Sequence, residues 1–401
     1  MDVLALNIGS SSLKFALYPV QPGVTVGPAR VTGLAEGLQP GGVLRARLRS
    51  PQGTQDAPLA PGDTGSGLAC ALAALKPLLQ PHLQDGSLAA VAHRIVHGGA
   101  QFTGPVQLGE DELQALDALA PLAPLHQPHN LAGVRACQQA FAGVPQIGCF
   151  DTAFHQHLWP LEARFALPQA LHAQGIRRYG FHGLSYDYVA GCLADRHAGA
   201  AGPDGGRVLM AHLGNGASLC GMLAGRSVAT TMGFSALDGL VMGTRSGGLD
   251  PGVLLYLLQQ GWDEPRLSRL LYAESGLLGV SGLSADMRTL RASHDPRARL
   301  AIDLFVHRVV REGGALMTLL EGLDTLAFTG GIGEHDATTR AAIARGWRVW
   351  GVQIDEAANA AADGSAMVRI DASGSRAEVW VVPTDEGRVA ARQAVQWLGL
   401  V

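Results

Sequence analysis

The alternation of apolar and polar positions predicts a β-hairpin at the start of the chain. Val3 to Tyr18 reads VLALNIGSSSLKFALY, two apolar runs on either side of a turn of Asn, Gly and three serines. Such a turn brings backbone N–H groups, hydroxyls and Lys14 together, and Gly9 leaves room for a ligand because it has no Cβ. We interpret it as a candidate phosphate-binding turn, although an ordinary exposed hairpin has the same pattern.

A second hairpin with this pattern follows about half a chain later. Val208 to Leu223 reads VLMAHLGNGASLCGML, and a repeat at this distance predicts duplicated halves. In Thr325 to Glu334, TLAFTGGIGE, a third apolar strand runs into a turn that contains Gly330, Gly331 and Gly333. We expect these three glycine turns to serve one nucleotide cleft, although each of them alone is more typical of a hairpin.

The rest of the chain changes from a strand-rich beginning to alternating strands and long helices. Residues 3–48 are predicted to be rich in strands, residues 51–66 to form an exposed loop, and residues 91–96 to form a strand. The turns predicted in the first of these segments are at Pro19, Gly23, Gly33 and Gly41. The predicted helices are Leu68 to Leu79, Pro251 to Gly261 after the cap Asp250, and Arg297 to Glu321 before Gly322. This order indicates an α/β protein with mixed sheets.

Composition limits the partners and the compartment. The 401 residues, 47% hydrophobic and 16% charged, suffice for two domains with a large core. The formal net charge of −4 and the lack of a basic block argue against nucleic acid as a partner, so any bound phosphate is expected to be small. Five scattered cysteines without a C-x-x-C pair indicate a reducing compartment. With neither a signal sequence nor an apolar run long enough to cross a bilayer, we expect a cytoplasmic protein without a membrane partner.

Four charged or titratable residues beside strands or glycines are candidates for chemistry. Arg94, in AHRIVHGG, can clamp a carboxylate or phosphate through two parallel hydrogen bonds, or form a surface ion pair. Asp151 follows a short apolar strand, and from the residues alone we favour a helix cap over a catalytic carboxylate. His182, in RRYGFH, and Arg245, in MGTRSGGLDP, can neutralise charge on a phosphoryl group in transfer.

Taken together, the motifs resemble those of the acetate kinase family. They occur in order over nearly the whole length as NIGSSSLKF, HRIVHGG, PLAPLHQPHN, FDTAFH, RRYGFHG, HLGNGAS, MGTRSGGLDPG, SGLSADMR and FTGGIGE. The resemblance implies the fold of the actin, sugar-kinase and Hsp70 superfamily, an α/β fold with two duplicated, ribonuclease H-like βββαβαβα domains around a nucleotide cleft. The expected domains are residues 1–150 with 386–401, and residues 151–385. The resemblance also implies a homodimer.

The reaction that the resemblance implies is reversible transfer of the ATP γ-phosphoryl group to acetate by direct in-line attack, giving acetyl phosphate and ADP. It needs Mg²⁺, with Mn²⁺ as an alternative ion. The implied catalytic residues are Asp151, His182 and Arg245, and the implied metal ligands are Asn7 and Glu386. Arg94 would bind the acetate carboxylate, and Val96, Leu125 and Ala236 would line the pocket of its methyl group. The implied ATP contacts are Lys14, His212, Leu213, Gly214, Asn215, Gly216, Asp286, Met287, Arg288, Gly331, Ile332, Gly333, Glu334 and His335.

Some positions depart from the family pattern. Ala236, in SALDG, stands where a pocket proline is common, and the volume it frees could admit propionate or another short acyl chain. Gly248 replaces a common Asp, while Met287 and His335 change the expected adenosine contacts and leave the phosphoryl donor open between ATP and pyrophosphate. The alternatives are a propionate or short-chain acyl kinase of the same family, and a non-catalytic nucleotide switch of the actin and Hsp70 type. A switch has no need of an acceptor clamp such as Arg94.

Overall fold

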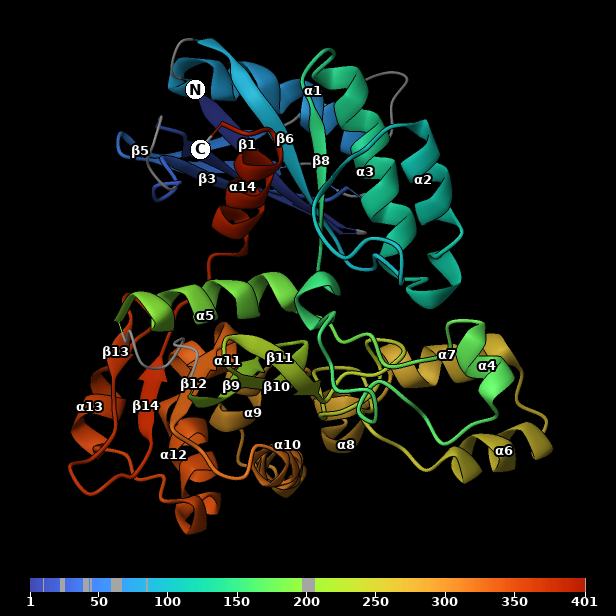
Figure 1. Ribbon diagram of the computed structural model, residues 1–401, viewed down its shortest axis with the longest axis vertical. Coiled ribbons are helices and arrows are strands. Elements are labelled where there is room, and N and C mark those ends of the chain that lie inside the picture. The colour runs from blue at the N-terminus through green and yellow to red at the C-terminus, as the bar shows by residue number, and fades with distance from the viewer. Residues whose placement is uncertain are drawn as a thin grey trace. The chain divides into compact units, whose positions relative to one another are not determined.

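The computed structural model describes residues 1–9, 11–21, 26–38, 43, 45–58, 67–83, 86–196 and 206–400. The chain forms two compact units, Met1–Ala153 with Asp385–Val401, and Phe154–Thr384 (Figure 1). Each unit contains one mixed sheet with helices on both of its faces. In the described ranges, no helix combines the length and the apolar character that a membrane span requires.

The first unit is built on a sheet of eight described strands in the order β5-β4-β3-β2-β1-β6-β8-β7. β1 pairs antiparallel with β2 and parallel with β6, which pairs parallel with β8. These strands are β1 (Asp2–Ile8), β2 (Ser12–Pro19), β3 (Val31–Glu36), β4 (Arg45–Ser50), β5 (Gly53–Pro58), β6 (Leu88–Ile95), β7 (Val106–Gln107) and β8 (Gln146–Phe150). The hairpin predicted at the N-terminus and the strand predicted at residues 91–96 are therefore confirmed.

Helices cover both faces of this sheet. Its helices are α1 (Gly67–Leu79), η1 (Gln80–His82), α2 (Glu110–Asp117), η3 (Ala120–Leu122), α3 (Gln127–Ala140) and α14 (Glu386–Trp397). Alternate residues of β1 and β2, such as Leu4, Leu6 and Leu13, join a core with α1 and α3, and α14 lies on the opposite face (Figure 1). The apolar spacing of α14 explains this position, because Val389, Ala390, Ala394 and Val395 are buried.

The second unit repeats the central part of this sheet. Its order is β11-β10-β9-β12-β14-β13, with β9 antiparallel to β10 and parallel to β12, and β12 parallel to β14. The strands are β9 (Arg207–Leu213), β10 (Ala217–Leu223), β11 (Arg226–Thr230), β12 (Thr325–Thr329), β13 (Val368–Arg369) and β14 (Glu378–Val381). The five-strand run β11-β10-β9-β12-β14 matches β3-β2-β1-β6-β8 in order and direction, as duplication predicts.

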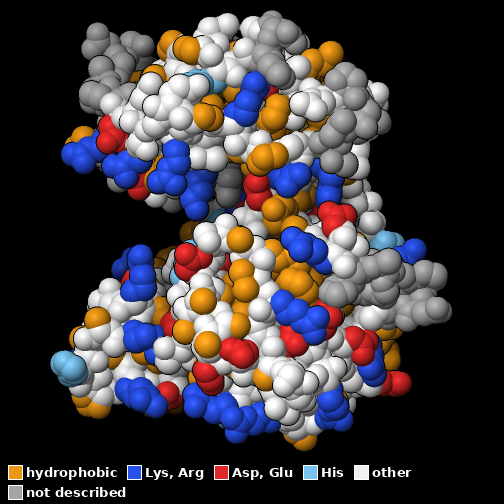
Figure 2. Space-filling view, turned by 90° about the vertical axis from the view of Figure 1, so that its left-hand side faces the viewer, with side chains coloured by type: hydrophobic (Ala, Val, Ile, Leu, Met, Phe, Trp, Pro, Cys, Tyr) orange, Lys and Arg blue, Asp and Glu red, His pale blue; other side chains and the backbone are white. Residues whose placement is uncertain are grey.

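The described helices of the second unit lie partly on the two faces of its sheet and partly beside it (Figure 1). They are α4 (Gln169–Ala173), α5 (Gly183–Arg196), α6 (Pro251–Gln259), α7 (Glu264–Ala273), α8 (Gly276–Ser281), α9 (Met287–Ala292), α10 (Pro296–Leu319), α11 (Gly330–His335), α12 (Ala337–Gly346) and α13 (Glu356–Ala361). Two 3-10 turns, η4 (Ala153–His155) and η5 (Arg348–Trp350), complete the elements. α5 covers one face through Tyr186, Val189 and Leu193, and α10 covers the other (Figure 1). On the face in Figure 2, basic and acidic side chains of this unit are interspersed.

Several local predictions need correction. Gly33 is not in a turn but inside β3 opposite Phe15, where a Cβ would overlap the aromatic ring. The segment predicted as a loop at 51–66 contains β5, which pairs with β4, and its residues 59–66 lie outside the described part. Gly330, Gly331 and Gly333 open helix α11 rather than a turn. The predicted turns at Gly23 and Gly41, and Ser10 of the first hairpin, also fall outside the described residues.

Candidate active site

Three predicted site residues of the first unit lie at the carboxyl ends of neighbouring parallel strands. Leu6 of β1 pairs with His93 of β6, so Asn7 and Arg94 are the next residues on these two strands. Asp151 follows the last residue of β8. Because the carboxyl ends of parallel strands meet at one edge of a sheet, the fold brings these polar side chains to the same edge.

Arg94 is the centre of this edge. Its Nε and Nη2 donate to the two carboxylate oxygens of Asp151 over 3.0 and 2.7 Å, and Nη1 lies 3.2 Å from Oε2 of Glu386, the first residue of α14. The side chains of Arg94, Asp151 and Glu386 are 19%, 2% and 20% exposed. Burial acts against the charge of Arg94, but the two carboxylates outweigh it and raise the pKa of this guanidinium above its usual value.

These contacts decide between the alternatives that the sequence left open for Arg94 and Asp151. Arg94 is mostly buried and paired with two carboxylates, so it is not an exposed surface ion pair. Both hydrogen bonds described for the Asp151 carboxylate come from Arg94, and none comes from a helix backbone, so the helix-cap interpretation of Asp151 was wrong. A guanidinium held between two carboxylates at a strand end is suited to recognise a small anion that can exchange with one of its partners.

The other predicted residues of the first unit differ in exposure. Asn7 and Lys14 are directly paired across β1 and β2, so their side chains lie on the same face; Asn7 is half-buried and Lys14 is exposed. Val96 is buried at 9% exposure, whereas Leu125 is 48% exposed. Val96 is therefore part of the packed interior, and Leu125 lies at the surface.

Two buried amides that the sequence analysis did not single out hold the strand ends in place. Asn130 donates to the carbonyl of Ile8 over 2.7 Å and accepts from the N–H of Val96 over 3.1 Å, which ties β1 to β6. Gln127 donates to the carbonyl of His97 over 3.0 Å. Both lie at the start of α3, in the HQPHN sequence, and the only signal in the sequence was the presence of amides in a helix that faces the core.

In the second unit, two histidines stack beside the β9–β10 hairpin. The rings of His182 and His212 are parallel to within 21°, with centroids 4.1 Å apart. Nδ1 of His182 lies 2.9 Å from Oγ of Ser218, which is also 2.6 Å from the hydroxyl of Tyr186. Nδ1 of His212 lies 2.8 Å from Oγ of Ser185. These contacts hold both rings through their Nδ1 atoms.

The backbone at His182 is strained. Its φ is 60°, in the left-handed region that side chains other than glycine rarely adopt, and it directly precedes the first residue of α5. Such strain costs about 1–3 kcal/mol and persists where surrounding contacts demand it. Here it directs the ring toward Ser218 and His212.

His182 and Arg245 meet at Gly216. A Cβ on this glycine would lie 3.2 Å from Nε2 of His182 and 3.3 Å from Nη2 of Arg245. Nη1 of Arg245 donates to the carbonyl of Ala236 over 2.9 Å, so the predicted pocket residue orients the guanidinium through its backbone. His182 and Arg245 therefore converge on the glycine turn between β9 and β10, where an imidazole and a guanidinium can donate hydrogen bonds to an anionic group.

The glycine sequence after β12 forms the start of α11. Gly330 has φ 76°, and a Cβ there would lie 2.8 Å from the carbonyl oxygen of Leu213, whereas Gly331 has open space around it. Oε1 of Glu334 accepts from the N–H groups of Gly330 and Thr384, over 2.9 and 3.0 Å. Glu334 therefore stabilises the start of α11, and Gly331, one turn away, leaves its backbone accessible.

A fully buried arginine supports this segment from behind. Arg340 donates to the carbonyls of Gly333 and Glu334 over 3.0 and 2.8 Å, and to Oδ1 of Asn359 over 2.8 Å. His335 is held at the other side, with Nδ1 2.6 Å from the carbonyl of Asp363. Arg340 was not among the predicted residues, because a single arginine in a helix gives no sign of burial.

Asp286 is one of the residues predicted to contact ATP, and it also has a structural role that its motif did not reveal. Its carboxylate caps α9 by accepting from the backbone N–H of Arg288 and Thr289. The side chain of Arg288 also binds it, and this bond together with the cap lowers the pKa of Asp286 to about 2. Met287 is 5% exposed, so its side chain mainly packs in the protein interior and offers little surface to a ligand.

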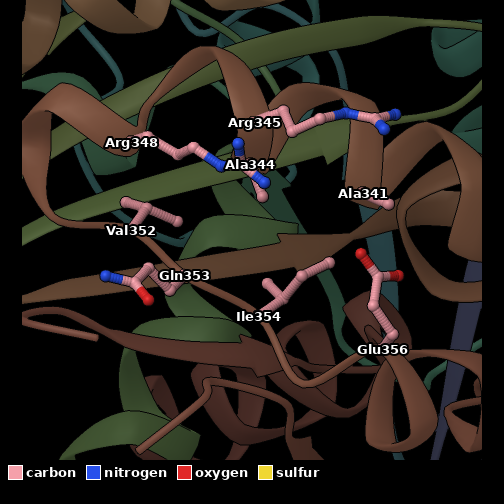
Figure 3. Close-up of a pocket in the computed structure, with 8 residues that line it drawn as sticks. All are labelled: Ala341, Ala344, Arg345, Arg348, Val352, Gln353, Ile354 and Glu356. Carbon is pink, nitrogen blue, oxygen red and sulfur yellow. The ribbon is translucent and has the colours of Figure 1, made fainter. Parts of the chain in front are cut away.

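Figure 3 shows a cavity of the second unit that none of these residues lines. It has a volume of about 360 Å³ and lies between α12, η5 and the start of α13. Ala341, Ala344, Val352 and Ile354 form its apolar part, and Arg345, Arg348, Gln353 and Glu356 its polar part.

Comparison with known proteins identifies the family. The family model described as the acetokinase family matches residues 2–392. The chain belongs to the acetokinase family. A protein of Rhodopseudomonas palustris strain CGA009, named acetate kinase, is 48% identical over 391 residues, with 97% of this chain and 96% of that protein covered.

Solved structures of acetokinase-family proteins have the same fold. The crystal structure of a propionate kinase from Francisella tularensis gives a TM-score of 0.88 at 36% identity, with 98% of both chains covered. That of Porphyromonas gingivalis acetate kinase gives 0.85 at 34% identity, with 99% of both covered. The resemblance and the fold class predicted from the sequence are confirmed, and as a member of the acetokinase family this chain is a phosphotransferase.

Proposed function

We propose that this chain is an acetate kinase, which transfers the γ-phosphoryl group of ATP to acetate in a reversible, direct in-line reaction. The observation that carries the proposal is Arg94, a mostly buried guanidinium bound by two carboxylates at the carboxyl edge of the first sheet. A nucleotide-binding protein with no acceptor would not need such a group. The relatives named acetate kinase, at 48% identity over the full length, support the same conclusion.

In the first unit, Arg94 holds the carboxylate of the acceptor. Acetate is already ionised at neutral pH, so the reaction needs no general base to remove a proton from it. Asp151 keeps the guanidinium in one orientation through its two hydrogen bonds. Val96, buried directly after the end of β6, forms part of the wall for the methyl group.

The carboxylates of the first unit fit a Mg²⁺ ion that accompanies ATP. Among the described residues no group of three or more His, Cys, Asp or Glu side chains is arranged to hold a metal alone. Mg²⁺ usually takes one or two carboxylates and completes its shell with water and substrate phosphates. Glu386, with Asn7 at the same edge, would supply these ligands, and the ion would neutralise charge on the phosphates.

In the second unit, Arg245 and His182 stabilise the phosphoryl group in transfer. Phosphoryl transfer depends mainly on positioning and on neutralising charge on the equatorial oxygens. Both side chains are fixed by hydrogen bonds and converge at Gly216. ATP lies along residues 212–216 and 331–335, where Gly216 and Gly331 allow close approach to the backbone, with residues 286–288 and Lys14 as further contacts.

Trapping of the product with hydroxylamine tests this proposal. The purified protein is incubated with Mg²⁺, hydroxylamine and either ATP or pyrophosphate as donor, against acetate, propionate, butyrate and formate in parallel. We expect acetyl hydroxamate with ATP and acetate to form fastest. No hydroxamate from any pair would overturn the kinase proposal in favour of a nucleotide switch.

Propionate is the second candidate acceptor, and two observations favour its inclusion. One solved structure of the family, at a TM-score of 0.88, is a propionate kinase from Francisella tularensis. Ala236 also leaves more space than a proline in the segment that orients Arg245. One methylene changes the discrimination between two substrates by only about 1–3 kcal/mol. The rate with propionate relative to that with acetate therefore decides which of the two is the preferred acceptor.

We also propose a cytoplasmic homodimer in which α6 of the second unit contacts a second copy. This helix has no buried residue although it reads PGVLLYLLQ, and Val253, Leu255, Tyr256 and Leu258 are 39–61% exposed. An exposed apolar helix face of this kind is typical of an obligate interface. Sedimentation should show a dimer that Leu255→Glu dissociates, whereas Leu300→Glu, on an isolated exposed leucine of α10, leaves it intact. A monomeric wild-type protein would contradict this assignment.

A further inference from the structure

Arg94 has one edge at which an acceptor can bind, and Glu386 occupies part of it. Nε and Nη2 form the edge that binds Asp151 through two parallel hydrogen bonds. The other edge, formed by Nη1 and Nη2, is the one at which a second carboxylate can bind in the same forked geometry. Glu386 lies on Nη1 at 3.2 Å, so it competes with an incoming acetate for that nitrogen.

Charge adds to this competition. With Asp151 and Glu386 both beside Arg94, the group already carries more negative than positive charge. An acetate bound at the same guanidinium would face repulsion from both carboxylates, in surroundings where Asp151 is 2% exposed and screening by water is weak. Removing Glu386 from Nη1 therefore relieves both the direct competition and part of the repulsion.

Glu386 is placed so that it can move without unfolding its helix. It is the first residue of α14, its side chain is 20% exposed, and the helix N-terminus is held instead by Asp385, which accepts from the N–H of Arg388. Asp385 is itself bound by the hydroxyl of Tyr18 over 2.5 Å. The backbone of this turn is thus fixed independently of the Glu386 side chain.

We propose that Glu386 is a latch on the acceptor site: it blocks the Nη1/Nη2 edge of Arg94 until a divalent cation draws its carboxylate away. This inference rests on the proposed function and deepens it by coupling the two ligands. Acetate binding and metal binding then strengthen each other, and by linkage the coupling is the same in both directions. The enzyme gains a preferred order, with the metal nucleotide before the acceptor.

Equilibrium binding of ¹³C-acetate, followed by NMR line broadening without turnover, tests the latch. Without metal, Glu386→Ala should bind acetate on the order of tenfold more tightly than wild type, the size of one charge-assisted hydrogen bond, with Glu386→Gln between them. MgCl₂ with ADP should tighten acetate binding more in wild type than in Glu386→Ala. The matched control Glu312→Ala, which removes a carboxylate from a surface pair with Arg311, should behave as wild type.

Two outcomes separate the latch from the proposed function. Equal acetate affinities of wild type and Glu386→Ala without metal, in a protein that forms acetyl hydroxamate, would overturn the latch and leave the kinase proposal intact. Absence of acetyl hydroxamate from wild type would overturn the kinase proposal itself. Arg94→Lys, which keeps the charge but has no Nη1/Nη2 edge, should lose acetate binding with and without Mg²⁺; if it kept that binding, acetate would not be bound at Arg94 and the latch would fail.

Discussion

The two units share a five-strand core of the same order, but different kinds of residue follow the equivalent strands. In the first unit β6 ends at Arg94 and Ile95, and β8 is followed by Asp151, so charged side chains meet at the edge. In the second unit the equivalent β12 is followed by Gly330 and Gly331. One edge therefore offers charge and the other offers exposed backbone.

The hairpins of the two units differ in the same way. A Cβ on Gly9, between β1 and β2, would make only an ordinary contact, 3.8 Å from the carbonyl oxygen of Ser12. A Cβ on Gly216, between β9 and β10, would press against His182 and Arg245 at 3.2 and 3.3 Å. The same five-strand core therefore carries charged side chains at its edge in one unit and glycines in the other, and we propose that the first binds the small carboxylate and the second the polyphosphate.

Among the substitutions considered, loss of Arg94 should have the largest effect on activity and stability, because the charged edge of the first unit depends on it. Arg94→Ala leaves Asp151 and Glu386 without their cation, and breaking such a buried pair costs about 3–5 kcal/mol of stability. We expect acyl phosphate formation to fall at least about 1,000-fold, since an arginine that clamps a reacting group is worth that much. Arg47→Ala, which breaks an exposed pair with Asp56 on the same sheet, should change stability little and leave activity unchanged, because water screens such a pair. Denaturant unfolding and hydroxamate assays measure both, and equal losses in the two variants would contradict the assignment.

The first unit should also be sensitive to acid. Burial lowers the pKa of His93 and His97 to about 4, below the value of 6.5 expected in the unfolded chain. The unfolded chain therefore binds more protons between these two pH values, and the free energy of unfolding falls as the pH falls through this window. His93 alone should account for a loss of about 3 kcal/mol between pH 7 and pH 4.

Urea unfolding at a series of pH values tests this contribution. His93→Gln cannot take up a proton and keeps a polar group beside Gln146, so its stability should fall less steeply between pH 6.5 and 4. An unchanged slope in the variant would show that His93 does not titrate in this range.

A smaller and more local effect is expected in the second unit. Gly216→Ala pushes a methyl group against His182 and Arg245, so kcat should fall about 10- to 100-fold while stability changes little, as is typical of groups misplaced by an ångström or less. Gly314→Ala, in open space within α10, should instead stabilise the protein by about 0.5–1 kcal/mol without affecting kcat. A wild-type kcat for Gly216→Ala would contradict the proposal that His182 and Arg245 act at this turn.

The sequence predicted the regular elements and the family well because their signals are local. The period of apolar residues identified β1, β2, α1 and α10, and Asp250 caps α6 as expected. Long-range contacts were not accessible in this way. That Gly33 makes room for Phe15, that Asn130 ties β1 to β6, and that Arg340 is buried beneath α11 all depend on residues brought together from distant parts of the chain.

In the candidate site, too, the residue types were predictable from the sequence and their long-range contacts were not. Arg94 and Asp151 were recognised as candidates from the residues, but not that they bind each other, and so a helix cap was favoured for Asp151. The capping role of Asp286 was missed because its motif was assigned to nucleotide binding. The strained backbone of His182 was not predictable, because the sequence does not give its dihedral angles. The motifs give the identity of the groups, and the fold gives their partners.

The central proposal is that the first unit binds the acceptor and the second unit binds the nucleotide. Its most direct test is a pair of KM values, for acetate and for ATP, in Arg94→Lys and Gly331→Ala. Gly331 has open space and no positive φ, so alanine fits the protein and can disturb only a ligand. Arg94→Lys should raise the KM for acetate at least about tenfold with little change for ATP, and Gly331→Ala should raise the KM for ATP alone. If both variants changed the same KM, the assignment of acceptor to the first unit and nucleotide to the second would be wrong.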